Sequence, residues 1–355
     1  MSNVANQSGL WADPLFGANH FTLLRWGLAL GVVVGHAWLI PTGYEPTRIH
    51  DWTLSYLAVN GFFILSGLLI AKSLEMRKDV KGYARSRLLR IYPALIVLML
   101  ALLFFFGPAF SNPGGIRYLV DSEPWTYVLR VLLMGDPLSA PGGVFGMSSD
   151  PVFNGALWTI RYEMLAYVLA GIGFFSGFLK NRWRVLTSLL ISQLFYLVLQ
   201  HASILNDAPD GVVALFRFTT AFLLGMTLWH FPVLRRAGWL SICVAIGSFL
   251  LLGRTPIGET LANITLAAGL MHFGLVRSAS RTIATMPDYS YGIYIWHYPV
   301  LQSVLLLNPD MHPVALLAVS APPVILAAAA SWHVIEKPAL QLKKRRRTTG
   351  RLGER

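Results

Sequence analysis

Long runs of apolar residues dominate the chain, and short polar segments separate them. A run of about 18 or more apolar residues with few charges is typical of a membrane-spanning helix. The pattern therefore predicts an all-α, polytopic membrane protein with about ten transmembrane helices. The expected spans are 21–40, 54–74, 91–110, 156–178, 185–204, 212–231, 238–253, 257–275, 289–307 and 313–334.

The spans suggest a simple organisation around one membrane domain. We expect an N-terminal segment over 1–20, a ten-helix domain over 21–340 and a basic tail over 341–355. The longest connection, 111–155, contains the stretch WTYVLRVLLM, which predicts a short helix lying in the membrane interface. No polar segment at either end is long enough to fold alone.

Composition supports the membrane assignment. The 355 residues are 55% hydrophobic and only 13% charged, whereas soluble domains carry roughly 25% charged residues. The single cysteine, Cys243, lies within an apolar run. It supports neither a disulfide framework nor a cysteine-based metal site, and we expect no metal.

The distribution of positive charge predicts the orientation of the spans. With the N-terminus inside, 21 of the 29 lysines and arginines fall on the inner side, four on the outer side and four within spans. Positive charge concentrates on the cytoplasmic face of membrane proteins, so both termini are predicted to be cytoplasmic. The net charge of +12 is thus assigned to contact with anionic lipid and not with nucleic acid.

The first span, RWGLALGVVVGHAW, contains Arg25 and His36. Eleven residues turn a helix to within roughly 20° of the starting direction, so both side chains share one face about 16 Å apart. Arg25 could simply reach the lipid headgroups, and His36 could be a packing residue. Their shared face favours function. Arg217 and His230, thirteen residues apart, fall on opposite faces and are interpreted as structural.

The stretch ALWTIRYEMLAYVL places an acidic residue, Glu163, inside a span. Thr159 and Tyr167 share its helix face, while Arg161 points elsewhere. Two interpretations remain open. Glu163 pairs with an arginine of another helix, or it acts as an orienting group or a base near the histidine or a substrate, because ionisable residues within spans are commonly functional.

Two further stretches carry candidate chemistry. YARSRLLRIYP brings Arg85, Arg87 and Arg90 to the start of one span. They are either ordinary cytoplasmic anchors or a site for a ligand with several phosphates, which guanidinium groups bind well. YSYGIYIWHYPV places His297 in mid-span among aromatic residues that suggest pocket walls.

Five stretches together resemble one family. LLRWGLALGVVVGH, NGFFILSGLLIAKS, RSRLLRIYP, LWTIRYE and SYGIYIWHYP are similar, in the same order, to motifs of the membrane acyltransferase-3 family. The resemblance runs from about residue 21 to 340. The chain differs in having Thr22 where many members have an aspartate. We expect no extracytoplasmic esterase-like domain of the kind that some members carry, so the protein would complete the transfer itself or need a separate extracytoplasmic protein.

The resemblance implies an integral membrane O-acyltransferase of the bacterial cytoplasmic membrane. Its donor would be cytoplasmic acyl-CoA, most often acetyl-CoA, as a co-substrate and with no permanently bound cofactor. Its acceptor would be a hydroxyl of an extracytoplasmic or cell-envelope glycan. The residues expected to serve are His36, Glu163 and Arg25 in catalysis, Arg85, Arg87 and Arg90 in acyl-CoA binding, and Trp158, Arg161, Tyr291 and His297 in acceptor binding.

Several alternatives stay open. His36 acts as a general base, or an acyl-enzyme forms on His36 or Ser66. Ser66 lies beside Gly67, and small residues also allow membrane helices to pack closely. A secondary transporter or lipid-linked-sugar flippase would also use buried charges, but no motif recurs in the other half of the chain as an inverted repeat would require. A non-catalytic scaffold would leave His36 and Glu163 unexplained.

Overall fold

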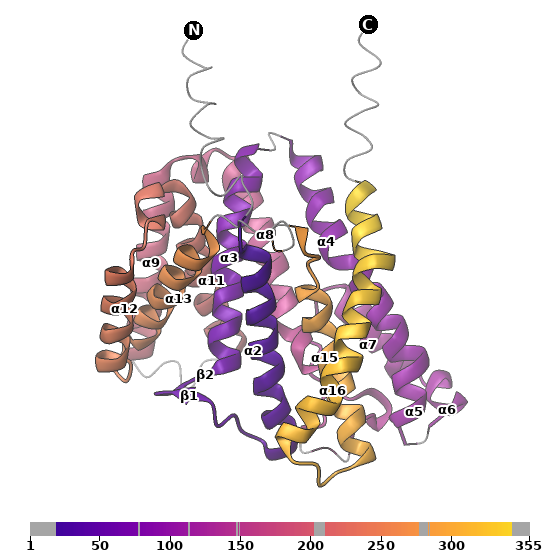
Figure 1. Cartoon of the computed structure of the whole chain (residues 1–355). Coiled ribbons are helices and arrows are strands. Elements are labelled where there is room, and N and C mark those ends of the chain that lie inside the picture. The colour runs from indigo at the N-terminus through magenta and orange to yellow at the C-terminus, as the bar shows by residue number, and fades with distance from the viewer. Residues whose placement is uncertain are drawn as a thin grey trace, which may run out of the picture. The chain divides into compact units, whose positions relative to one another are not determined.

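The computed structural model describes residues 19–76, 79–112, 114–146, 148, 150–201, 210–276, 283 and 285–342. This part of the chain is almost entirely helical, which confirms the all-α class (Figure 1). The only strands within it are the short pair β1 (Arg48–Ile49) and β2 (Trp52–Thr53), which are antiparallel. Most of the predicted segment 1–20 and of the predicted tail 341–355 lies outside the described residues.

Each of the ten predicted ranges overlaps a helix. Within the described residues, five helices are long and apolar enough to cross a membrane. The number of spans and the orientation of the termini stay predictions. The five are Phe21–Thr42, Leu54–Met76, Val80–Phe110, Asp210–His230 and Pro313–Leu342.

The chain divides into two compact units that alternate along the sequence, and one of the boundaries between them falls inside α2 (Phe21–Thr42). Unit 1 takes 19–28, 48–72 and 176–288 of the described chain. Within it α9 packs against α11, and α12 packs against α13 (Figure 1). Its elements are the first part of α2, β1, β2, most of α3 (Leu54–Met76), η5 (Phe178–Lys180), α9 (Arg182–His201), α11 (Asp210–His230), η6 (Pro232–Arg235), α12 (Trp239–Leu252) and α13 (Gly258–Gly274).

Unit 2 takes 29–47, 73–175 and 289–342. Its most extensive helix pair is α15 against α16 (Figure 1). Its elements are the rest of α2, α4 (Val80–Ala101), η2 (Leu102–Phe106), α5 (Gly107–Phe110), α6 (Ile116–Val120), α7 (Ser122–Leu132), η3 (Pro141–Gly143), η4 (Gly155–Thr159), α8 (Ile160–Phe175), α15 (Ser290–Leu307), α16 (Pro313–Ala330) and η7 (Ser331–Glu336).

In unit 1, α3 and α11 cross at a pair of glycines. A Cβ atom on Gly67 would lie 1.9 Å from the Phe222 carbonyl oxygen, and one on Gly225 would lie 1.9 Å from the Ile64 carbonyl oxygen. Neither distance is tolerable between unbonded heavy atoms, so both positions require glycine. The sequence NGFFILSG is therefore used here for backbone contact between helices.

A buried polar network also joins the helices of unit 1. The Arg217 guanidinium donates from Nε to Asn60 Oδ1 at 2.7 Å and lies over the Tyr56 ring. Its Nε is 3.7 Å from Glu259 Oε1, and Tyr196 donates to the other Glu259 oxygen at 2.7 Å. The charge of Arg217 is thus matched by a carboxylate, which agrees with the structural role expected for it.

The long connection of unit 2 contains the helix expected in it. Asp121 caps α7 by accepting from the Glu123 backbone N–H at 3.1 Å. The helix buries Tyr127 and exposes Leu129. The end of the connection is tied to α15, since Gln302 Nε2 donates to the Asp150 carbonyl oxygen at 2.6 Å and Asn154 Nδ2 donates to the Ile295 carbonyl oxygen at 2.9 Å.

Candidate active site

Unit 2 contains all but one of the expected site residues. Arg25 belongs to unit 1, although it shares α2 with His36. The structure brings six of the nine expected residues of unit 2 into two groups, and Arg85, Trp158 and Arg161 lie outside both. One is a histidine pair, His36 and His297. The other, which we call the arginine–carboxylate cluster, consists of Arg87, Arg90, Glu163, Tyr167, Tyr291 and Glu336.

The histidine pair joins α2 to α15. His36 Nδ1 lies 2.8 Å from His297 Nε2. The ring planes differ by 25° and the centroids are 5.0 Å apart, so the rings meet edge to edge through their nitrogens. His297 is fully buried, whereas His36 is partly exposed. The sequence motifs predicted both residues but not their contact.

Aromatic and hydroxyl side chains surround this pair. The Tyr298 ring stands edge-on to His36 at 5.4 Å between centroids, and its hydroxyl donates to the Asp150 carboxylate. Thr159 and Tyr294 share a hydrogen bond of 2.7 Å between their hydroxyls. These contacts fix α15 to η4 and to the loop before it, and so hold the ring of His297 in place.

The arginine–carboxylate cluster begins with a buried ion pair. Arg90 Nη1 lies 3.3 Å from Glu336 Oε2, and Glu336 is only 2% exposed. Ser331 donates to the other Glu336 oxygen at 3.1 Å. Tyr291 lies beneath the Arg90 guanidinium at 5.7 Å and donates to the Ile91 carbonyl at 3.2 Å. The charge of Arg90 is therefore already balanced within the protein.

The same cluster holds Glu163. Its carboxylate accepts a hydrogen bond from Tyr167, one turn further along α8. Arg87 lies over the rings of Tyr83 and Tyr167 at 6.0 Å and 5.6 Å. The predicted face of Tyr167 and Glu163 is confirmed, while Thr159 bonds to Tyr294 instead.

Arg85 contacts the end of the described chain. Its Nη2 donates to the Leu342 carbonyl at 3.4 Å. Neither Arg85 nor Arg87 has a carboxylate among the ion pairs found in unit 2 over the described ranges. Unlike Arg90, these two arginines therefore form no ion pair with a carboxylate in the described part of unit 2.

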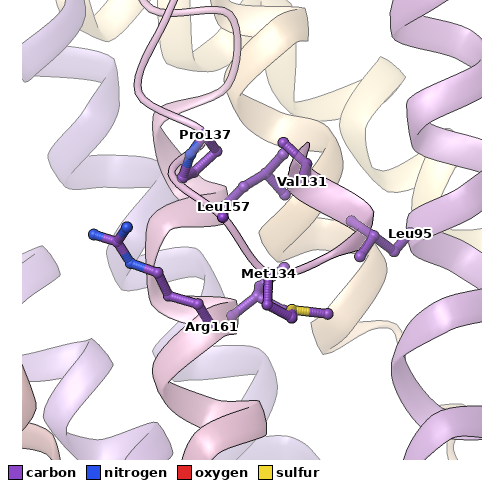
Figure 2. Close-up of a pocket in the computed structure, with 8 residues that line it drawn as sticks. Leu95, Val131, Met134, Pro137, Leu157 and Arg161 are labelled. Atoms are coloured by element: carbon purple, nitrogen blue, oxygen red, sulfur yellow. The ribbon is translucent and has the colours of Figure 1, made fainter. Parts of the chain in front are cut away.

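Trp158 lies in η4 and Arg161 in the first turn of α8, where Arg161 is one of the residues that line a small, mostly apolar hollow. Arg161 Nη1 lies 3.6 Å from Asp136 Oδ1, and its guanidinium covers the Tyr162 ring at 5.0 Å. Trp158 meets the same ring edge-on at 5.8 Å. In Figure 2 the Arg161 guanidinium points away from the apolar side chains of the hollow. That hollow has room for about one water molecule, and its lining includes Leu95, Val131, Met134, Pro137 and Leu157.

Arg25 has partners that the sequence did not suggest. Its Nη2 lies 3.1 Å from Asp288 Oδ2 and 3.4 Å from Thr22 Oγ1. Thr22, which stands where many family members have an aspartate, thus supplies Arg25 with an acceptor from the same helix turn. The neighbouring Trp26 indole donates to the Pro287 carbonyl at 3.1 Å, which holds the same segment against α2.

Sequence reasoning missed Glu336, Asp288 and Asp150. Each lies just outside an expected span, where charged residues are ordinary, so apolar runs gave no signal for them. The stretch SWHVIEKP offers one clue to Glu336, since it places an acidic residue directly after an apolar run.

Comparison with known proteins explains why these motifs occur together. Residues 19–332 match the family profile described as an acyltransferase domain. The chain belongs to this acyltransferase family. The match covers both members of the histidine pair and most of the arginine–carboxylate cluster, but stops before Glu336.

Three relatives of this acyltransferase illustrate its range. It is 24% identical to an "O-acetyl transferase" of Shigella phage Sf6, with 90% of this chain and 95% of the relative covered. It is 28% identical to "Nodulation protein 10" of Rhizobium leguminosarum bv. viciae, with 92% and 94% covered. It is 29% identical to "Acyltransferase MdmB" of Streptomyces mycarofaciens over 41% of this chain and 36% of the relative. No solved structure matches the chain significantly.

Proposed function

We propose that this acyltransferase moves an acyl group, most simply acetyl, from cytoplasmic acyl-CoA to a hydroxyl of an extracytoplasmic or cell-envelope glycan. It would do so as a multi-pass protein of the bacterial cytoplasmic membrane. The O-acetyl transferase name of one relative supports an oxygen acceptor and an acetyl donor. The predicted orientation supports a donor on the inner side.

The observation that carries the chemistry is the contact between the partly exposed His36 and the fully buried His297 in unit 2, whose ring nitrogens lie 2.8 Å apart. Titratable groups at such positions are commonly functional. His36 would take the proton of the acceptor hydroxyl as its oxygen attacks the thioester carbonyl. The C–S bond then breaks, and the proton passes from His36 to the coenzyme A sulfur.

The arginines supply the proposed donor site. Arg85 and Arg87 would bind the coenzyme A phosphates, because guanidinium groups recognise phosphate oxygens in pairs. Arg90, whose charge Glu336 balances, would help chiefly by holding α4 against η7. Arg87, stacked on two tyrosines, is preoriented for a ligand.

The remaining residues would support the acceptor and the developing charge. Glu163, held by Tyr167, would orient the acceptor, and Trp158, Arg161 and Tyr291 would contribute to its binding. Arg25 would stabilise negative charge on the donor. A possible accessory extracytoplasmic protein would act only if the acceptor lies beyond reach of the membrane domain.

Transfer from radiolabelled acetyl-CoA in membranes tests the function. Wild type, His36→Ala and His230→Ala would be compared at matched expression, since His230 is also a partly exposed histidine of a long apolar helix but lies in unit 1. We expect label to reach envelope glycan in wild type and His230→Ala, and to be lost in His36→Ala. If both variants transfer like wild type, His36 is not the base. If neither wild type nor the variants transfer an acyl group from acetyl-CoA or another acyl-CoA, the result favours the transporter interpretation over the acyltransferase one.

A further inference from the structure

The contact of His297 with the backbone of its own helix determines which nitrogen donates in the hydrogen bond between the two histidines. His297 Nδ1 lies 3.1 Å from the carbonyl oxygen of Ile293, one turn earlier in α15. A carbonyl oxygen only accepts hydrogen bonds, so the proton of this contact must belong to His297 Nδ1. This one assignment determines the rest of the chain of contacts.

A neutral imidazole carries a single ring proton. With that proton on Nδ1, His297 Nε2 is bare and can only accept. His36 Nδ1 is 2.8 Å away, closer than the roughly 3.5 Å at which unbonded heavy atoms pack, so a proton lies between the two nitrogens. His36 Nδ1 must supply it. The bare nitrogen of neutral His36 is then Nε2.

We infer that His297 is a positioning residue that holds His36 as the Nδ1–H tautomer and leaves Nε2 free as the base. This inference rests on the proposed function, in which His36 accepts the proton of the acceptor hydroxyl. It gives His297 a role different from direct contact with the acceptor, which agrees with its complete burial.

The pair suits a base that must gain and lose a proton. Before the reaction both rings are neutral, and a neutral pair is far cheaper to bury in a membrane protein than a histidine beside a carboxylate. When the acceptor oxygen bonds to the acyl carbon, its proton moves to His36 Nε2, and His36 becomes an imidazolium that still donates to His297. When the C–S bond breaks, that proton passes to the coenzyme A sulfur and restores the starting tautomers.

The surroundings limit other arrangements of the two rings. Tyr298 stands edge-on to His36 at 5.4 Å between centroids and is itself held by Asp150. The Ile293 carbonyl lies on the same helix as His297, so rotation of α15 as a body does not break their contact. The pair is thus fixed at its buried end and open at the His36 end.

Two substitutions of His297 separate orientation from packing. Glutamine places an amide oxygen near the position of Nε2 and can still accept from His36 Nδ1–H, whereas phenylalanine fills the space with no acceptor. We expect full-length His297→Phe in membranes to lose about 10²–10⁴-fold in kcat with little change in KM for acetyl-CoA. His297→Gln should stay within about tenfold of wild type. Equal losses in both variants, with both correctly folded, would overturn the inference.

Nitrogen NMR of the purified, ¹⁵N-histidine-labelled wild-type protein gives a readout that does not need activity. The His36 signals are identified by their absence in His36→Ala, and we expect a protonated Nδ1 and a bare Nε2 at neutral pH. A protonated Nε2 would overturn the inference. If the expected tautomer is found but wild type transfers no acyl group, the orientation of His36 stands and the proposed function fails instead.

Discussion

Arg90 and Glu336 form an ion pair that closes α4 against η7, with Glu336 Oε2 3.3 Å from Arg90 Nη1. Glu336 is 2% exposed, so its charge depends on this arginine and on Ser331. Removing one partner of a buried ion pair leaves an unpaired charge, which typically costs about 3–5 kcal/mol. The pair therefore makes a strong prediction about stability.

Arg90→Met should destabilise the protein by roughly 3 kcal/mol, and Arg90→Met combined with Glu336→Leu should recover most of that loss. Thermal unfolding of the purified protein in detergent measures both. The matched control is Asp136→Ala, which removes the 55% exposed partner of Arg161 and should cost under about 1 kcal/mol. A double variant less stable than Arg90→Met would contradict the ion-pair interpretation.

The α3–α11 crossing predicts two positions where even a methyl group is harmful. Gly67→Ala and Gly225→Ala each place a Cβ atom 1.9 Å from a backbone oxygen, so we expect losses of about 1–3 kcal/mol as the helices separate. Gly247→Ala in α12 meets nothing within 4 Å and should be neutral or stabilising. Melting temperatures and the yield of monodisperse protein compare the three, and similar behaviour of all three would refute the prediction.

Exchanging the charges of Arg25 and Asp288 separates structural from catalytic use of Arg25. Their side chains are 3.1 Å apart and both are mostly buried. We expect Arg25→Asp to lower stability and Arg25→Asp with Asp288→Arg to restore it. Acetyl transfer should stay low in both, because the proposed function places the Arg25 charge at the donor. Recovery of transfer along with stability would show that Arg25 serves only the fold.

Tyr127 carries a buried hydroxyl for which the described chain offers no hydrogen-bond partner. Burial also raises the pKa of Tyr127 well above its usual range. The folded protein thus keeps a proton that the unfolded chain releases above about pH 10, so this residue weakens stability as the pH rises past that value. Tyr127→Phe should add about 1 kcal/mol at neutral pH and more at pH 11. Unfolding measured at both values checks this, and a less stable variant would indicate a partner for the hydroxyl.

Apolar runs predicted the helices well because a helix in a membrane must supply its own backbone hydrogen bonds and an apolar surface. The ranges 54–74 and 212–231 therefore nearly match α3 and α11. The sequence did not predict that these two helices cross at Gly67, since a small residue in a helix can serve packing, flexibility or a substrate site. The number of membrane spans is not established in the same way, because only five helices of the described chain are long and apolar enough to cross a membrane, whereas ten spans were predicted.

The candidate site could be predicted as residues but not as contacts. Arg25 and His36 share a face of one ideal helix, yet the ion-pair partner of Arg25, Asp288, and the ring partner of His36, His297, come from more than 260 residues later in the chain. Asp288 and His297 were each visible in the sequence, but nothing in local spacing says which distant helix they meet. Pairings of this kind are set by tertiary packing and not by periodicity.

The polar network of unit 1 has a consequence for how the protein is made. Arg217 precedes Glu259 in the chain, so its counter-charge is synthesised after it. Asn60 and the Tyr56 ring, however, belong to a helix already translated, and both contact the guanidinium in the finished fold. The chain thus offers a newly synthesised cation its uncharged partners first and its carboxylate last.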